Sequence, residues 1–389
     1  MRRVSMQLAK SGWDGFDFQF WNRTTWTLIR LRVLIEFRQG PPLRHSTQAL
    51  ETQIGLDQHT ILNSLSFPDY RAFVEAQPPA LRAPLHTIKW SPEFRAIISS
   101  APPPDLGQAA PVLVGSTRRI DLGNFSVLVL TPKGERPNQG WPVLFFIHGG
   151  GYMLGNSETG ISFFSRACVE ARCVVVSVDY RLAPEHPYPA AIDDCWEALQ
   201  WVRGVGKEEL GLDTSRVAVT GVSSGATLSA VIAQRASLAS PRIPLVLQIL
   251  VVPGTDMTFL ATDKSTWTPS MLEYQNLWAL RTLDMLWLRD HYLPNVEDRA
   301  RPDASPLLQE DKKAYEGLAP ALVIVNELDI LKSEGIMYAE KMKSHGVPVT
   351  LREIKGMTHI GLAADRVCEV ACRIRAEEIE ALKNAFSKL

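Results

Sequence analysis

A stretch that joins an apolar run, a glycine-flanked serine and a helical pattern constrains the fold more than any other part of the chain. The run covers residues 216–220, Gly221-Val-Ser-Ser-Gly225 follows it, and small and aliphatic residues recur at helical spacing over 226–235. This order predicts a buried parallel strand, a sharp turn and a helix. A serine in such a turn projects its hydroxyl away from the sheet, and the glycines leave room for the neighbouring strand and helix. Ser223 is therefore a candidate nucleophile, although an ordinary strand-to-helix turn can contain the same five residues.

Apolar runs of strand length recur on both sides of this stretch. Continuous aliphatic runs separated by helical patterns indicate a mostly parallel sheet with helices on both faces. Helical patterns of this kind cover residues 190–203 and 334–344. With the run at 216–220, the predicted sheet has eight strands, the other seven being residues 116–121, 125–130, 142–147, 173–178, 245–252, 321–325 and 349–354.

The strand series begins only after the first quarter of the chain. Residues 1–105 combine helical patterns with proline-rich breaks, which predicts a helical N-terminal region that contributes to a cap. Residues 106–389 form the expected catalytic domain. Within that domain the alternation of strands and helices stops at about 256–317, a stretch that carries several tryptophans and methionines, and we expect a helical cap insertion there.

Composition narrows the range of partners. The 389 residues are 46% hydrophobic and 21% charged, with a net charge of -1, so neither nucleic acid nor an acidic membrane is an expected partner. The five cysteines show no paired metal-binding spacing, which favours free thiols in a reducing compartment, and we expect a cytoplasmic protein without metal or cofactor. The composition neither predicts nor excludes a homodimer.

The N-terminus gives a weaker signal. Its positive charges precede no apolar stretch of the kind that a secretion signal has. Residues 21–37 are rich in Trp, Leu and Ile but include three arginines, so they are not expected to span a bilayer. A helix packed on the cap is the preferred interpretation, and a helix on a membrane surface is the alternative.

A nucleophilic serine needs a base, a group that orients the base, and donors for the oxyanion. His359 lies in the glycine-bounded loop 356–361 after the last predicted strand, and Asp329 lies just past the end of the preceding one. The chain order is serine, aspartate, histidine, each beyond the carboxyl end of a strand, as in an α/β-hydrolase triad. A lone loop histidine or aspartate is more often a solvated group, so the combination carries the prediction.

A glycine run supplies the remaining element. His148-Gly-Gly-Gly-Tyr152 follows the strand at 142–147, and successive glycines leave backbone amides open to a substrate oxygen. Directly after a hydrophobic strand and upstream of the serine turn, the run is better interpreted as an oxyanion loop than as a flexible turn.

These motifs, with Val178-Asp-Tyr-Arg-Leu-Ala-Pro-Glu-His-Pro-Tyr-Pro-Ala190, resemble the hormone-sensitive-lipase group of esterases in the α/β-hydrolase superfamily, from about residue 110 onward. The resemblance implies Ser223 as nucleophile, His359 as base and Asp329 as its orienting group. It also implies an oxyanion hole formed by the amides of Gly149, Gly150 and Ser224, and a cap built from the N-terminal helices and the 256–317 insertion.

The serine turn departs from the usual family pattern in two places. Val222 stands where the family usually has aspartate, and Ala226 stands where it usually has glycine. Ser224 replaces an alanine, which leaves its backbone amide available. The departures put catalytic efficiency in question more than mechanism.

The predicted function is cofactor-free hydrolysis of carboxylic esters, with short acyl groups or bulky small-molecule esters and lactones as substrates. One alternative is a pathway-specific role in secondary metabolism, in acyl transfer, lactone hydrolysis or product release. Another is a non-catalytic small-molecule receptor on the same fold. The receptors that resemble this family lack the triad histidine, whereas His359 is present here. Neither the natural substrate nor the oligomeric state follows from the sequence.

Overall fold

The computed structural model describes residues 67–77, 84–100, 104–277 and 279–387. The chain divides into two compact units. One comprises Met1–Gln53, Pro78–Ala83 and Trp90–Pro103, and its described part contains helix α6 (Pro92–Ser100). The other comprises Ile54–Gln77, Pro84–Lys89 and Pro104–Leu389 and contains the sheet and all the predicted site residues. The sequence predictions for residues 1–66, including the helix at 21–37, lie outside the described residues.

An eight-stranded sheet with the order β1-β2-β4-β3-β5-β6-β7-β8 forms the core of the larger unit. The first two pairings, β1 with β2 and β2 with β4, are antiparallel, and every later pairing is parallel. This arrangement confirms the predicted mostly parallel sheet. The strands are Ser116–Asp121, Ser126–Thr131, Trp141–Ile147, Val174–Asp179, Leu212–Val222, Leu247–Val251, Ala321–Leu328 and Val349–Thr358, numbered β1 to β8 in that order.

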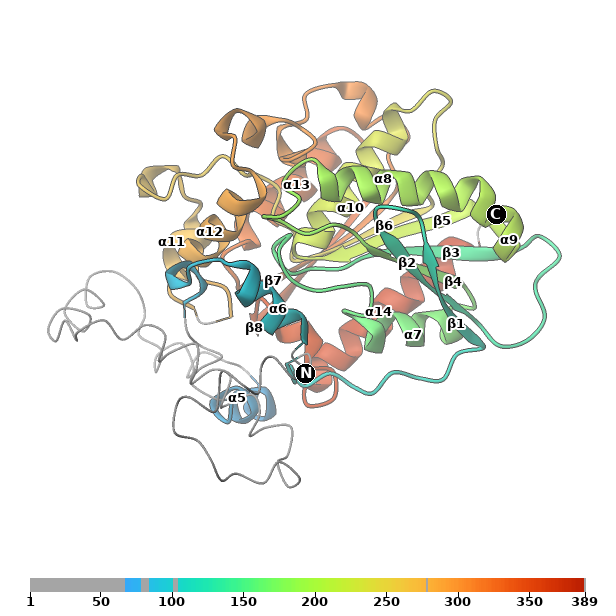
Figure 1. Ribbon diagram of the computed structural model, residues 1–389, viewed down its shortest axis with the longest axis horizontal. Helices are drawn as coiled ribbons and strands as arrows, with labels where there is room; N and C mark the ends of the chain where they lie inside the picture. Colours follow the sequence, from blue (N-terminus) through green and yellow to red (C-terminus); the bar gives the residue numbers. More distant parts are fainter. Residues whose placement is uncertain (1–66, 78–83, 101–103, 278, 388–389) are drawn as a thin grey trace, which may run out of the picture. The chain divides into compact units, whose positions relative to one another are not determined.

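Helices cover both faces of this sheet. Figure 1 shows α7 and α14 on one face and α8, α10 and α13 on the other. Helix α10 is buried along most of its length because its small residues let it pack closely on β5 and β6. The helices of this unit are α5 (Pro68–Glu75), α7 (Ile161–Glu170), α8 (Ala190–Arg203), α9 (Val205–Leu210), α10 (Ser224–Leu238), α11 (Pro269–Glu273), α12 (Thr282–Tyr292), α13 (Lys332–Ser344) and α14 (Glu369–Phe386).

Apolar continuity explains where the central strands form. Every residue of β3 and β6 is buried, as expected for parallel strands covered on both faces. Several strands extend beyond their apolar runs. β5 begins at Leu212, four residues before the predicted start, and β8 continues to Thr358. These extensions are polar or mixed in sequence, and their outer ends pair with the neighbouring strands, Leu212 with Trp141 of β3 and Thr358 with Leu328 of β7.

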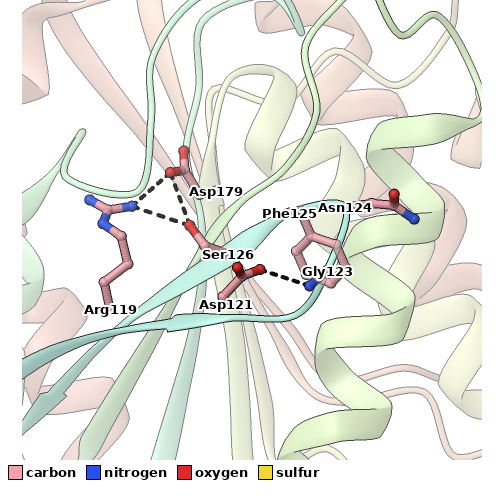
Figure 2. Close-up of a pocket in the computed structure, with 7 residues that line it drawn as sticks. All are labelled: Arg119, Asp121, Gly123, Asn124, Phe125, Ser126 and Asp179. Atoms are coloured by element: carbon pink, nitrogen blue, oxygen red, sulfur yellow. Dashed lines mark hydrogen bonds and ion pairs between the residues drawn. The ribbon is translucent and has the colours of Figure 1, made fainter.

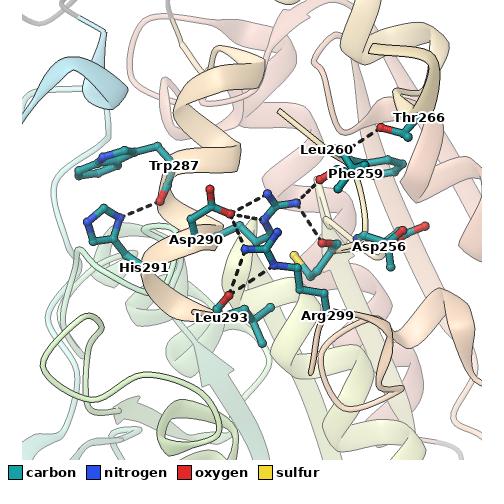
Figure 3. Close-up of polar contacts among 12 residues, drawn as sticks. Asp256, Phe259, Leu260, Thr266, Trp287, Asp290, His291, Leu293 and Arg299 are labelled. Carbon is teal, nitrogen blue, oxygen red and sulfur yellow. Dashed lines mark hydrogen bonds and ion pairs between the residues drawn. The ribbon is translucent and has the colours of Figure 1, made fainter. Parts of the chain in front are cut away.

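The chain between β6 and β7 contains α11, α12 and four short 3₁₀ helices, η5 (Lys264–Thr266), η6 (Val296–Ala300), η7 (Pro306–Leu308) and η8 (Lys312–Ala314). A buried arginine cluster ties this segment together. Arg289 donates to the carbonyl oxygens of Met257 and Phe259, and its guanidinium shares the Asp290 carboxylate with Arg299 (Figure 3). These bonds attach α12 to the chain that leaves β6.

Candidate active site

Ser223 lies at the turn between β5 and α10, where its backbone adopts φ 56° and ψ -124°. A non-glycine residue rarely adopts a positive φ, and such strain persists only where the surroundings hold it. The Ser223 amide donates to the carbonyl oxygen of Val251 on β6 at 2.8 Å. A side chain at Gly221 would collide with the backbone of Gly225, and one at Gly225 would collide with the backbone of Ile147. Close backbone approach therefore explains both glycines.

The structure brings the three predicted triad residues together. The Ser223 hydroxyl lies 2.9 Å from His359 Nε2, and His359 Nδ1 lies 2.8 Å from Asp329 Oδ2. The His359 and Asp329 side chains are 8% and 1% exposed, so the pair is shielded from water. The other carboxylate oxygen of Asp329 accepts the amide of Leu331 at 3.0 Å. With Nδ1 donating to Asp329, the neutral imidazole presents Nε2 as an acceptor toward the serine hydroxyl.

Two residues that the sequence did not reveal hold the segment before His359. Tyr70, on α5, places its hydroxyl 2.6 Å from the side-chain oxygen of Thr358. Asn326, on β7, donates through its side-chain amide to the carbonyl oxygen of Thr358 at 2.7 Å. Tyr70 and Thr358 are 288 residues apart, so no local pattern could have linked them.

Of the predicted oxyanion residues, Gly149 packs against the serine turn and Ser224 directly follows Ser223. A Cβ atom added to Gly149 would come within 2.6 Å of the Val222 carbonyl oxygen and 3.4 Å of the Ser223 side chain, so this glycine lies against Ser223. Gly150 has φ +124°, which requires glycine. Ser224 is the first residue of α10, and the amides of Ala226 and Thr227 are the ones that bond back to the Ser223 carbonyl. The Ser224 amide precedes that ladder, as amides do at a helix N-terminus.

The loop that carries these glycines is held by aromatic contacts. His148 is fully buried and stacks on Tyr180 with ring centroids 4.1 Å apart. Burial lowers the pKa of His148 to about 4, so its imidazole is neutral at physiological pH and Nδ1 donates to the Gly149 carbonyl at 2.8 Å. Tyr152 stacks on Tyr292 of α12 at 3.8 Å. These contacts restrict the position of the glycine run.

The two departures in the serine turn lie in apolar surroundings. Val222 is partly buried and packs against the hydrophobic core, where an aspartate would need a polar partner. Ala226 is fully buried in the first turn of α10. Both are therefore accommodated by apolar packing.

A separate surface hollow lies beside the turn between β1 and β2 (Figure 2). Its volume is about 480 Å³, and none of the predicted site residues lines it. Arg119, at its edge, bonds to Asp179 at 2.7 Å and to Glu158 at 3.2 Å. The guanidinium of Arg119 is therefore paired, whereas Asp121, which also lines the hollow, accepts the amide of Gly123 at 2.8 Å.

In the described part of the chain, no cluster of three or more His, Cys, Asp or Glu side chains could hold a metal ion. Over the same residues, no helix combines the length and the apolar character that crossing a membrane requires.

Known proteins share this sequence pattern. An AB hydrolase superfamily protein of Schizosaccharomyces pombe is 39% identical over 260 residues, which cover 67% of this chain and 74% of the yeast protein. The carboxylesterase NlhH of Mycobacterium tuberculosis is 37% identical over 268 residues, or 68% of this chain and 80% of the mycobacterial one. Among solved structures, an α/β hydrolase enzyme from the metagenome of Lake Arreo superposes with a TM-score of 0.72 at 28% identity, covering 83% of this chain and 99% of the other.

An eight-stranded sheet of this order, with a serine at a strained strand-to-helix turn, defines an α/β hydrolase. Residues 144–362 match the family described as the alpha/beta hydrolase fold. The chain belongs to this family, within the hormone-sensitive-lipase-like group of esterases, and its class is that of the carboxylic ester hydrolases.

Proposed function

We propose that the chain hydrolyses small-molecule carboxylic esters through an acyl-enzyme, with Ser223 as nucleophile, His359 as base and Asp329 as the group that orients His359. The unbroken series of contacts from the Ser223 hydroxyl through both ring nitrogens of His359 to Asp329 is the observation that carries this proposal. It also favours an enzyme over a receptor on the same fold, because binding alone does not require a serine in contact with a base.

In the first half of the proposed reaction, Ser223 Oγ attacks the ester carbonyl carbon while His359 Nε2 takes the hydroxyl proton. The tetrahedral intermediate places its negative charge at the amides of Gly149, Gly150 and Ser224, which are the proposed oxyanion donors. His359 then delivers the proton to the departing alkoxide as the bond between carbonyl carbon and alkoxy oxygen breaks. In the second half, water attacks the acyl-enzyme by the same steps, and the acid and free Ser223 are released.

A substrate range is proposed from the segment at 256–317, which with the N-terminal region would form the cap. Its aromatic and thioether side chains suit a compact, partly apolar substrate. Two of them, Trp267 and Met271, are buried in the hydrophobic core and contribute to packing, Trp287 is half-buried, and Trp278 lies outside the described residues. We infer short acyl groups on aromatic or cyclic alcohols, or lactones, as preferred substrates.

Covalent labelling tests the proposed nucleophile. A fluorophosphonate probe is expected to add one adduct per chain, at Ser223, as measured by intact mass and peptide mapping. Ser223→Ala should abolish the adduct and lower kcat/KM by on the order of 10⁴- to 10⁶-fold. Ser224→Ala is the matched control, since it removes the neighbouring hydroxyl and keeps the backbone amide, and it should retain labelling. More than about a tenth of the activity left in Ser223→Ala would refute the assignment.

A further inference from the structure

Glu334 is a buried carboxyl group close to the proposed triad that the mechanism above does not use. It follows Asp329 by five residues and lies in the first turn of α13, 1% exposed. Its Oε2 accepts the amides of Thr255 and Asp256 at 2.7 and 3.0 Å. The Thr255 hydroxyl donates to the Glu334 carbonyl oxygen at 3.1 Å. Three hydrogen bonds therefore join the start of α13 to the loop that follows β6.

That loop also contacts the serine turn. Val251, at the end of β6, accepts the amide of Ser223 at 2.8 Å. The hydroxyl of Thr227, in the first turn of α10, donates to the carbonyl oxygen of Gly254. Residues 251–256 thus contact the nucleophile's turn on one side and Glu334 on the other. Since α13 begins directly after the Asp329 segment, Glu334 connects the serine side of the triad to the aspartate side.

The remaining oxygen of Glu334, Oε1, is buried and has no hydrogen-bond partner among the described residues. Burial raises the pKa of Glu334 to about 8, opposed by the two amide bonds and reinforced by the charges of Asp256 and Asp329. The pKa of the buried Tyr152 phenol is raised by desolvation, with Glu334 as an added cause. Asp256, Asp329 and Tyr152 are therefore the ionisable groups that are electrostatically coupled to the ionisation of Glu334.

We propose that Glu334 is a positioning residue that holds the 251–256 loop against the Asp329 segment through its bonds to Thr255 and Asp256, and so keeps Ser223 and Asp329 in place relative to His359. The inference rests on the proposed triad. Ionised Glu334 would place a second buried negative charge near Asp329, and repulsion between the two carboxylates would disturb the loop that both the serine turn and α13 contact.

The test is the pH dependence of kcat for p-nitrophenyl butyrate, corrected for spontaneous hydrolysis, in the wild type, Glu334→Gln and Glu334→Ala. The wild-type kcat is expected to fall reversibly as pH rises through about 8. Glu334→Gln keeps an acceptor for the two amides and cannot ionise, so kcat at pH 7 should stay within about threefold of wild type and the alkaline fall should disappear. Glu334→Ala leaves both amides unsatisfied and should lower kcat at least about tenfold, with a smaller change in KM.

Glu378→Gln is the matched control. Glu378 is also fully buried with a raised pKa, but it bonds to Arg375 on α14 at 2.9 Å. This variant should lose stability while the pH profile of kcat keeps its wild-type form.

An alkaline fall in Glu334→Gln identical to that of the wild type would overturn the proposal, and so would an unchanged kcat in Glu334→Ala. Fluorophosphonate labelling of Ser223 separates the outcomes, because failure to label the wild type would refute the triad itself, whereas normal labelling with an unaltered profile would refute only the role of Glu334.

Discussion

At Ser223, backbone strain and hydrogen bonding act together. A positive φ at a non-glycine residue costs on the order of 1–3 kcal/mol, which the surrounding structure must offset. The Ser223 amide bonds to the carbonyl oxygen of Val251, and the Ser223 hydroxyl contacts His359 Nε2. The strained conformation is the one that directs the hydroxyl toward the imidazole.

His359 and Asp329 are expected to differ in the cost of their replacement. His359→Ala removes the proposed proton acceptor, whereas Asp329→Asn removes the charge proposed to orient the ring and stabilise the imidazolium. We therefore expect Asp329→Asn to lower kcat by no more than His359→Ala, and both to lower it by at least about 10³-fold. Steady-state kinetics on p-nitrophenyl butyrate measure both. An active His359→Ala would remove histidine from the mechanism.

His148 predicts an acid sensitivity of stability. Its folded pKa is lowered to about 4 by burial, so between that value and the usual ~6.5 the unfolded chain binds a proton that the folded chain excludes. This contribution to the free energy of unfolding is fully present above pH 6.5 and is lost as pH falls toward 4. Between pH 7 and pH 4.5, the free energy of unfolding measured in urea should fall by roughly 2 to 3 kcal/mol more in the wild type than in His148→Asn. Equal losses in the two proteins would contradict the buried neutral imidazole.

Among the elements, α12 has the clearest connection to the oxyanion loop. A Cβ atom at Gly151 would lie 2.6 Å from Leu288, and Tyr292 stacks on Tyr152. The arginine cluster of Arg289 and Arg299 holds α12 to the chain leaving β6. Helix α12 has one more contact, in which His86 Nδ1 lies 2.6 Å from Asp284 Oδ1. Through these contacts, α12 restricts the position of the glycine run.

Leu288→Ala tests this contact. Leu288 and Leu286 are both buried in α12, and Leu286 packs in the hydrophobic core. Truncation of either should destabilise the fold by about 2 to 4 kcal/mol through the cavity left behind. Only Leu288→Ala should lower kcat, by severalfold, because the three atoms nearest to a Cβ added at Gly151 all belong to Leu288. The same kcat in both variants, with matched losses in unfolding free energy, would show that α12 supports the fold and not the oxyanion loop.

For the whole molecule, the proposed substrate range depends on the surface character of the 256–317 segment. The apolar residues of the described 256–317 segment pack mainly inward, and the exposed large ones, Leu260, Leu272, Leu283 and Val296, are separated in sequence by ten or more residues. Individual exposed apolar side chains are normal on a protein surface. This distribution favours small substrates that reach the site individually over a lipid interface.

A chain-length series measures this preference. At equal concentrations below solubility limits, kcat/KM for p-nitrophenyl acetate or butyrate should exceed that for the palmitate by at least about tenfold, because a short acyl group needs less desolvated surface under the proposed cap. Ser223→Ala provides the background rate for each ester. Faster turnover of palmitate, or activation by an emulsion, would contradict the short-acyl proposal and favour membrane docking by residues 21–37.

Local sequence patterns were sufficient to predict the succession of strands and the serine turn, although not every strand end. Continuous aliphatic runs can be buried on both faces only in a covered parallel sheet, and Gly221 and Gly225 report a close backbone approach. The contacts of Ser223 with His359, 136 residues away, and of Tyr70 with Thr358 depend on strand order instead. The neutral state predicted for Glu334 depends on burial, which the sequence Asp329-Ile-Leu-Lys-Ser-Glu334 does not express. Residue type and spacing therefore determined which groups could react, whereas the packing of β5 to β8 decided which groups meet and how water and charge are excluded around them.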